Sequence, residues 1–148
     1  MAKPRKIDHP KNTQNPVVAN TKILEQLDDN IRFSYKYLDD SHEKFCVYQK
    51  PAEYFVKLND RLKHLSSITA KEFQTTPSKA LRNHSFDFTN SKISEDCFGI
   101  PSEEQIVDKP WQFGITGNEY GRAHGFFVKN TFYIVWLDPD HKLCPAGK

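Results

Sequence analysis

The sequence predicts an α+β protein, in which an N-terminal strand and a helical pair pack on a small antiparallel β-sheet. Apolar residues recur at helical spacing in the first half of the chain and alternate with polar ones in the second half. With 148 residues, 37% of them hydrophobic and 13% aromatic, the chain has enough apolar surface for one aromatic-rich core. We therefore expect a single α+β domain over residues 21–148.

Residues 1–20 differ from the rest of the chain. They are rich in proline, asparagine and lysine and show no apolar period, which predicts a disordered basic arm. Charge is also unevenly spread further on: residues 44–82 carry eight basic side chains against three acidic ones, whereas residues 87–108 carry six acidic side chains against one lysine. This polarity favours a nucleic-acid backbone at one face, or it is only a solvated surface.

The sequence argues against several classes of protein. No apolar stretch approaches the roughly 18 residues that span a bilayer, and the start lacks the apolar region of a signal peptide, so we expect a cytoplasmic protein without a membrane partner. Three distant cysteines without a CxxC pair argue against a disulfide framework and a thiolate zinc site. The chain has no P-loop, GxGxxG, GxSxG or HExxH motif.

The first half of the domain predicts a short helix, a strand and two further helices. "TKILEQLDD" places apolar residues on one side of a helix, and "IRFSYKYL" alternates as a half-buried strand does. "EYFVKLNDRLKHL" has the spacing of an amphipathic helix. Thr69 and Glu72 form a capping-box pattern for a shorter helix that ends near Thr75, and Pro77 opens another helical turn.

Residues 83–109 are polar, acidic and interrupted by glycine and proline, which predicts a long surface segment. The chain then turns β-rich, with "WQFGIT" followed by the hairpin "GRAHGFFVKNTFYIVWLDPDH" around a two-residue turn at Lys129 and Asn130. Mirror pairing across that turn assigns one face to the core: Ala123, Gly125, Phe127, Phe132, Ile134 and Trp136. The other face holds Arg122, His124, Phe126, Val128, Thr131, Tyr133, Val135 and Leu137.

Arg122, His124 and Tyr133 are the first candidate site. An arginine can hold a phosphate, a histidine can move a proton, and a tyrosine can stack on a base. These are the groups that a metal-independent ribonuclease needs. The alternative is that other elements cover this face, His124 is a semi-buried structural residue, and Arg122 pairs with an acid such as Asp138.

Two further clusters carry possible chemistry. Asp138, Asp140 and His141 offer ligands for a divalent metal, although Asp-Pro-Asp is also ordinary turn chemistry. Lys79, Arg82 and His84 precede Phe86 and Phe88, a combination that suits phosphate contact and base stacking. The alternative for this run is a solvated helix end with cations near the C-terminal dipole.

The order of elements, a strand, two helices, a long connection and a β-meander with an arginine in its hairpin, resembles the RelE-type toxin fold of bacterial toxin–antitoxin systems. The resemblance spans about residues 31–143, with residues 83–109 standing as an insertion. It implies a small ribonuclease without a cofactor that cuts messenger RNA, commonly on the ribosome, and that binds a cognate antitoxin protein. The string "GRAHGFFVKNTFYIVWLDPDHKL" also resembles a signature of uncharacterised bacterial proteins, which implies kinship without an activity.

The resemblance implies roles for particular residues. Arg122 matches the arginine of the central strands, His124 could act as acid or base, and His141 stands where the family often has a late tyrosine or histidine. Lys79 and Arg82 match the basic residues that precede the sheet. We therefore expect catalytic Arg122, His124 and His141, and an RNA-binding set of Lys79, Arg82, His84 and Tyr133.

The leading hypothesis is a toxin that cleaves messenger RNA as a metal-independent endoribonuclease. The alternative is a non-catalytic module, from a mobile element or defence locus, that binds nucleic acid or protein through the same face. A third class is a metal-dependent nuclease built on Asp138, Asp140 and His141.

Overall fold

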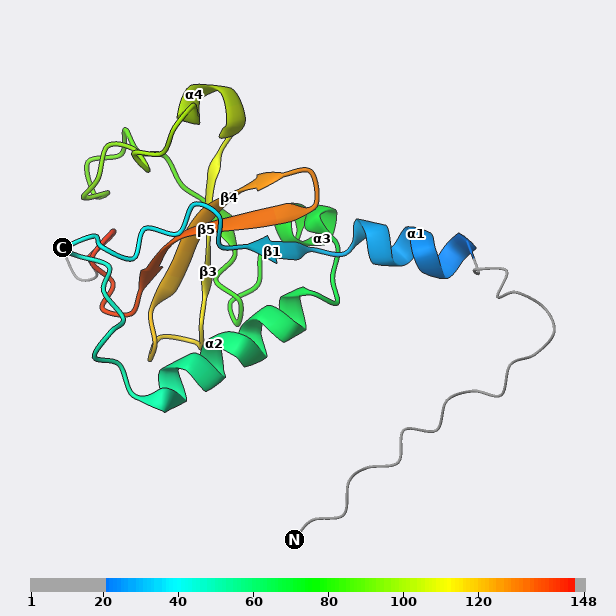
Figure 1. Cartoon of the computed structure of the whole chain (residues 1–148), viewed down its shortest axis with the longest axis horizontal. Helices are drawn as coiled ribbons and strands as arrows, with labels where there is room; N and C mark the ends of the chain where they lie inside the picture. The colour runs from blue at the N-terminus through cyan, green and yellow to red at the C-terminus, as the bar shows by residue number, and fades with distance from the viewer. Residues whose placement is uncertain (1–20, 146–148) are drawn as a thin grey trace, which may run out of the picture.

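The protein has a mixed α+β fold, which confirms the predicted class. The computed structural model describes residues 21–145, so the arm expected over residues 1–20 lies outside the described part. The elements follow the order α1 (Thr21–Asp29), β1 (Arg32–Ser34), α2 (Ala52–Leu65), α3 (Ala70–Thr75), β2 (His84–Ser85), α4 (Glu103–Ile106), β3 (Pro110–Gly114), β4 (Arg122–Val128) and β5 (Thr131–Asp138) (Figure 1).

The five strands form one sheet in the order β1-β5-β4-β3-β2. Strands β2 to β5 pair antiparallel, as predicted, but β1 runs parallel to β5. A parallel neighbour requires a long crossover connection, and here helices α2 and α3 lie in the chain between β1 and the other strands. The sheet is therefore mixed, not purely antiparallel.

Helices α2 and α3 form where the sequence predicts them. Tyr54, Leu58 and Leu65 of α2 are buried on the side that faces the sheet. Thr69 caps α3, because its hydroxyl accepts a hydrogen bond from the Glu72 amide at 3.0 Å. The amphipathic period and the capping box thus each give the correct element.

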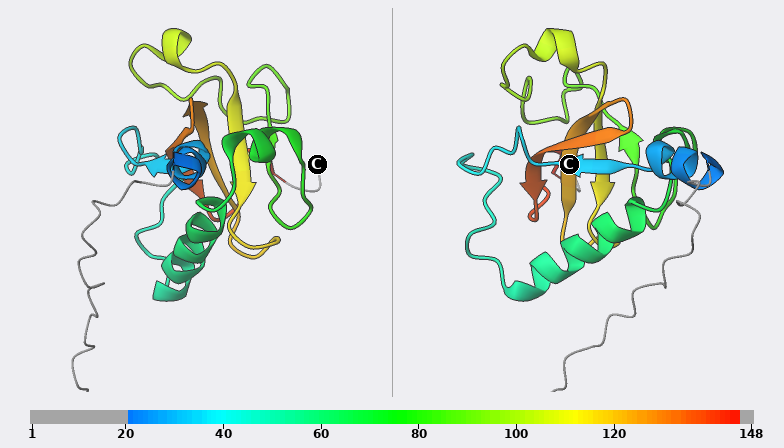
Figure 2. Two further views of the ribbon diagram at one scale, coloured as in Figure 1. Left: turned by 90° about the vertical axis from the view of Figure 1, so that its right-hand side faces the viewer. Right: turned by 45° about the vertical axis from the view of Figure 1, so that its right-hand side comes forward.

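Two expectations for the first half need correction, whereas the short helix over TKILEQLDD is confirmed. Residues 77–81 form turns instead of a helix, because the buried Asn83 side chain binds the backbone of this stretch and of α3. The first strand is only three residues long. Helix α1 forms, but Figures 1 and 2 show it extending from the body, so its apolar residues Ile23, Leu24 and Leu27 stay exposed.

The core has two parts, one on each face of the sheet. Helices α2 and α3 cover the first face, where Phe113, Phe132 and Ile134 are fully buried. Loops, not long helices, cover the second face: residues 37–47 and 86–107 pack aromatic and aliphatic side chains on Phe126 and Trp136. The segment over residues 83–109, predicted as a surface segment, therefore contributes the buried Phe98 and several half-buried side chains to the second part of the core.

The β4–β5 hairpin has the predicted register only near its turn. Pairs from Val128↔Thr131 to Gly125↔Ile134 are as expected, but a bulge follows and shifts each later pair by one residue. The bulge lies where the chains approach closely, since a Cβ on Gly125 would stand 1.9 Å from the Tyr133 carbonyl oxygen.

The shift exchanges two side chains between the faces of the sheet. Trp136 pairs with His124 and joins the core on the loop-covered face, whereas Leu137 pairs with Ala123 and joins the helix-covered face. The predicted faces of Trp136 and Leu137 are therefore wrong.

No helix within residues 21–145 is long and apolar enough to cross a bilayer.

Candidate functional site

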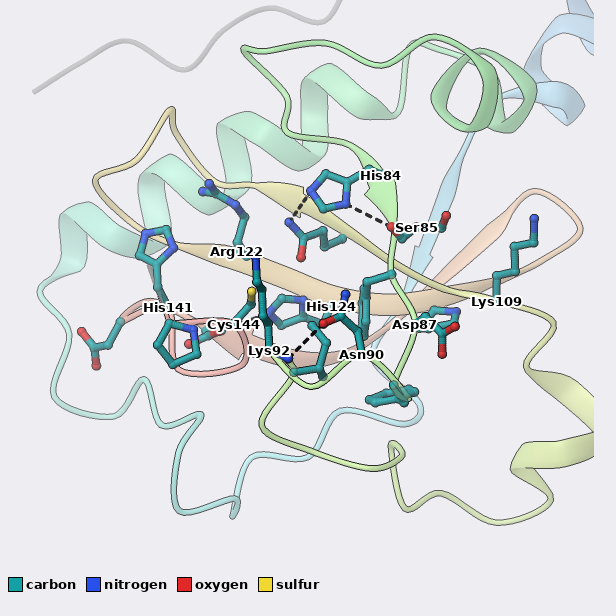
Figure 3. Close-up of a pocket in the computed structure, with 18 of the residues that line it drawn as sticks. His84, Ser85, Asp87, Asn90, Lys92, Lys109, Arg122, His124, His141 and Cys144 are labelled. Atoms are coloured by element: carbon teal, nitrogen blue, oxygen red, sulfur yellow. Dashed lines mark hydrogen bonds and ion pairs between the residues drawn. The ribbon is translucent and has the colours of Figure 1, made fainter. Parts of the chain in front are cut away.

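An open groove with a volume of about 1500 Å³ lies over the loop-covered face, where β2, β3 and β4 meet the turn after β5. Figure 3 shows its lining side chains. Four of the predicted site residues line it: His84, Arg122, His124 and His141. The others, Lys79, Arg82 and Tyr133, are not part of the lining.

His124 lies at the floor of the groove and is only 1% exposed. Its Nε2–H donates to Asp138 Oδ2 at 3.2 Å, and its ring meets Phe86 edge to face. Among the described residues nothing pairs with Nδ1. Burial lowers the pKa of His124, and the adjacent Asp138 only partly opposes this. His124 is therefore a neutral, buried residue, which agrees with the structural alternative for it.

Asp138 is the centre of a hydrogen-bonded turn. Its carboxylate also accepts hydrogen bonds from the backbone amides of Lys142 at 2.8 Å and Leu143 at 2.9 Å. Burial alone would raise the pKa of Asp138, but the hydrogen bonds from His124 and these amides outweigh it, so that the pKa is lowered. The carboxylate thus stays charged and fixes the turn that carries His141.

The metal hypothesis is not supported. Asp138 is used by the turn, and Asp140 pairs with Lys50 at 2.9 Å. No group of three metal-ligating side chains occurs within residues 21–145 that could hold an ion. The Asp-Pro-Asp sequence therefore acts as turn chemistry.

Arg122 and His141 meet at one short loop. Arg122 Nη1 donates to the Gly117 and Gly121 carbonyl oxygens, each at 3.1 Å. His141 Nε2–H donates to the next carbonyl of that loop, Asn118 O, at 3.0 Å. Figure 3 shows both side chains at the same end of the groove. The loop therefore positions a guanidinium and an imidazole side by side.

Gly121 allows this arrangement. It has a φ of +72°, and a Cβ there would stand 2.0 Å from the Asp138 carbonyl oxygen. Only glycine permits both the backbone conformation and the close approach. The loop and the turn after β5 are thereby held together.

Arg82 adds a second guanidinium beside the groove. Its side chain lies over Gly114, which pairs with Arg122 on β4: a Cβ on Gly114 would stand 3.3 Å from Arg82 Cγ. Burial and the charge of Arg82 both lower the pKa of Arg122, and Asp138 raises it. Among the described residues no acceptor pairs with the buried Arg82 Nε. Two like charges close together form a favourable place for an anion.

The remaining predicted residues have simpler surroundings. His84 is exposed, its Nδ1–H donates to Ser85 O at 3.1 Å, and its Nε2 accepts from Gln112 at 2.9 Å. Lys79 is exposed and lies outside the groove. Tyr133 stacks on Phe126 with ring centroids 5.2 Å apart, so it belongs to the core beside the site.

Sequence reasoning missed the other end of the groove. The sequence marks Phe86 and Phe88 as stacking residues, but Asp87, Asp108 and Lys109 also line the groove. No sequence pattern brings residues 86–88 and 108–110 together. A backbone hydrogen bond from Phe86 N to Pro110 O, at 3.0 Å, does so in the structure.

No match emerges from comparison with protein-family models, with curated proteins or with solved structures.

Proposed function

We propose that the protein is a metal-independent endoribonuclease of the RelE-like toxin type, acting on messenger RNA. The observation that carries this proposal is the juxtaposition of Arg122 and His141 on the consecutive carbonyls of Gly117 and Asn118. A cation that binds phosphate and a proton acceptor stand together in an open groove, next to a second guanidinium.

The architecture supports the RelE-like part of the proposal. A strand is followed by two helices and then by an antiparallel meander, with Arg122 at the start of the central strand β4. The segment over residues 86–107 covers much of the sheet face that the family leaves for RNA. The groove beside it is the part of this face that stays open.

In this proposal three side chains carry the chemistry. Arg122 and Arg82 hold the phosphate that is cleaved and stabilise the charge that develops on it. His141 Nδ1 accepts the proton of the ribose 2′-hydroxyl, whose oxygen attacks phosphorus. The 5′-oxygen leaves and takes a proton from solvent, which gives a 2′,3′-cyclic phosphate and a 5′-hydroxyl end. His84 contributes a contact to RNA at the groove wall.

His124 has a different role from the catalytic one that the resemblance implies. It is buried and holds Asp138, so it positions the turn of His141 instead of meeting RNA. The proposal also places the protein in the cytoplasm, with a cognate antitoxin as partner and the ribosome as the context of cleavage. It needs no cofactor.

The test is the growth of bacteria that express the protein, together with cleavage of labelled RNA by the purified protein. Arg122→Ala and His141→Ala should each remove growth inhibition and slow cleavage at least a hundredfold. The matched controls are Arg32→Ala and His64→Ala, which alter exposed residues outside the groove. Full toxicity in folded Arg122→Ala protein would refute the proposal.

A second candidate, a non-catalytic nucleic-acid-binding module, is favoured by one observation. All three expected catalytic side chains make internal bonds: His124 binds Asp138, Arg122 binds the Gly117 and Gly121 carbonyls, and His141 binds the Asn118 carbonyl. This candidate predicts RNA binding that weakens with salt, without cleavage even on translating ribosomes.

A further inference from the structure

The groove has two chemically different ends. One end holds Arg122 and His141, whereas Figure 3 shows Asp87 and Lys109 at the other. Its volume of about 1500 Å³ exceeds that of common small-molecule pockets, roughly 300–1,000 Å³. A ligand that contacts both ends of the groove must be extended, with an anionic part at the first end and a different part at the second end.

The second end is an aromatic platform. Phe86 and Phe88 are half-buried, line the groove and meet edge to face with ring centroids 5.2 Å apart. Phe86 also abuts His124, and Phe88 abuts Phe98 at 5.0 Å. These contacts hold the rings in place before any ligand arrives. A preorganised aromatic surface beside a cationic site suits a base stacked out of a single strand.

The polar groups around this platform have a definite hydrogen-bonding pattern. Asp87 lies between the two phenylalanines, and its Oδ1 accepts hydrogen bonds from the Thr89 amide and hydroxyl, both at 2.8 Å. These bonds lower the pKa of Asp87, so the carboxylate is charged and can only accept. Within residues 21–145 no side chain or amide donates a hydrogen bond to Oδ2, which remains for a ligand.

Lys109 and Asp108 are the other charged residues beside this platform. The hydrogen bond from Phe86 N to Pro110 O brings both residues next to the platform. A lysine donates to base acceptors, and a second carboxylate strengthens the preference for a base edge rich in donors.

We propose that this end is a guanine subsite, built from Phe86, Phe88, Asp87 and Lys109. Guanine presents two adjacent donors, N1–H and N2–H₂, to a carboxylate, and its O6 and N7 accept from a lysine. Adenine and cytosine offer one amino donor next to a ring acceptor, and uracil flanks its donor with two carbonyls. A charged carboxylate therefore meets a repulsive acceptor on each of these three bases. This inference rests on the proposed function, because it names the base that the RNA-cleaving groove selects.

The experiment is calorimetric titration of the full chain with inorganic phosphate and with the 5′-monophosphates of guanosine, adenosine, cytidine and uridine. We expect the guanosine nucleotide to bind about tenfold more tightly than the other three. Asp87→Asn keeps an oxygen for the Thr89 bonds and should abolish this preference. Asp96→Asn, in the same loop but outside the groove, should retain it.

Equal binding of the four nucleotides, or a preference that survives Asp87→Asn, would overturn the guanine subsite. Binding of phosphate without any gain from a base would also overturn it, while leaving the proposed phosphate site intact. Absence of phosphate binding in the wild-type chain would count against the proposed function as well. Phe88→Leu provides a second variant, which should weaken the binding of all four nucleotides and leave the binding of phosphate unchanged.

Discussion

His124 and Asp138 form a buried pair, with His124 Nε2 and Asp138 Oδ2 3.2 Å apart and each residue only 1% exposed. The carboxylate also accepts hydrogen bonds from two backbone amides of the turn that leads away from β5. Because that turn carries His141, this pair connects the floor of the groove to the side chain at its rim. A structural pair thus supports a site whose reactive groups lie elsewhere.

Asp138→Asn should destabilise the fold by about 3 kcal/mol, because it removes a buried charge from three donors and introduces an amide donor that faces them. Urea denaturation measures this change in the free energy of unfolding. The matched control is Asp28→Asn, in an exposed pair with Arg32, which should change stability by less than about 1 kcal/mol. Equal stability of the two variants would mean that the buried pair contributes little.

The stability of the protein should fall as the solution is made acidic. The pKa of His124 is lower in the folded chain than its ordinary value of about 6.5, so below pH 6.5 the unfolded chain binds the extra proton. The loss is up to about 1.4 kcal/mol per pH unit until the folded-state pKa is reached. The lowered pKa of Asp138 adds a further loss below about pH 4.

Urea denaturation at pH 7.5, 6.5 and 5.5 tests this dependence against His124→Gln, which retains a donor to Asp138 and does not titrate. The difference in slope between the two proteins isolates His124, and His64→Gln serves as the control for an exposed histidine. If the wild-type protein gained stability relative to His124→Gln on acidification, the imidazolium form would be the stable one and the assigned direction would be wrong.

Gly125→Ala should destabilise the protein by about 3 kcal/mol or more, since the added Cβ would collide with the Tyr133 carbonyl at 1.9 Å and with the Phe132 ring at 2.7 Å. Both contacts lie at the bulge that sets the register of the site strands. Gly117→Ala is the control, because no atom lies within 4 Å of its added Cβ. A melting temperature unchanged in Gly125→Ala would show that the strands can separate there at little cost.

Much of the fold follows from local sequence patterns. The amphipathic period gives α2, the Thr69 cap gives α3, and alternation with a two-residue turn gives the β4–β5 hairpin. The bulge cannot be read this way, because it depends on the close approach of two strands at Gly125. The face assignments of Trp136 and Leu137, which follow the bulge on β5, are therefore exchanged.

The site is only partly visible in the sequence for a related reason. Arg122 and His141 can be identified as chemistry-bearing residues, but the loop that joins them at Gly117 and Asn118 has no signature. The burial of His124 results from aromatic residues in a segment without a period, including Phe86. Tertiary contacts between distant segments decide that His124 is buried and that His141 lines the groove.

The most direct measurement is cleavage of end-labelled single-stranded RNA in excess chelator, alone and on translating ribosomes, with identification of the new ends. We expect undiminished cutting that leaves 2′,3′-cyclic phosphate and 5′-hydroxyl ends, and that disappears in His141→Ala. Cutting that stops in chelator and returns with a divalent metal, or the absence of any cutting on either substrate, would contradict a metal-independent ribonuclease.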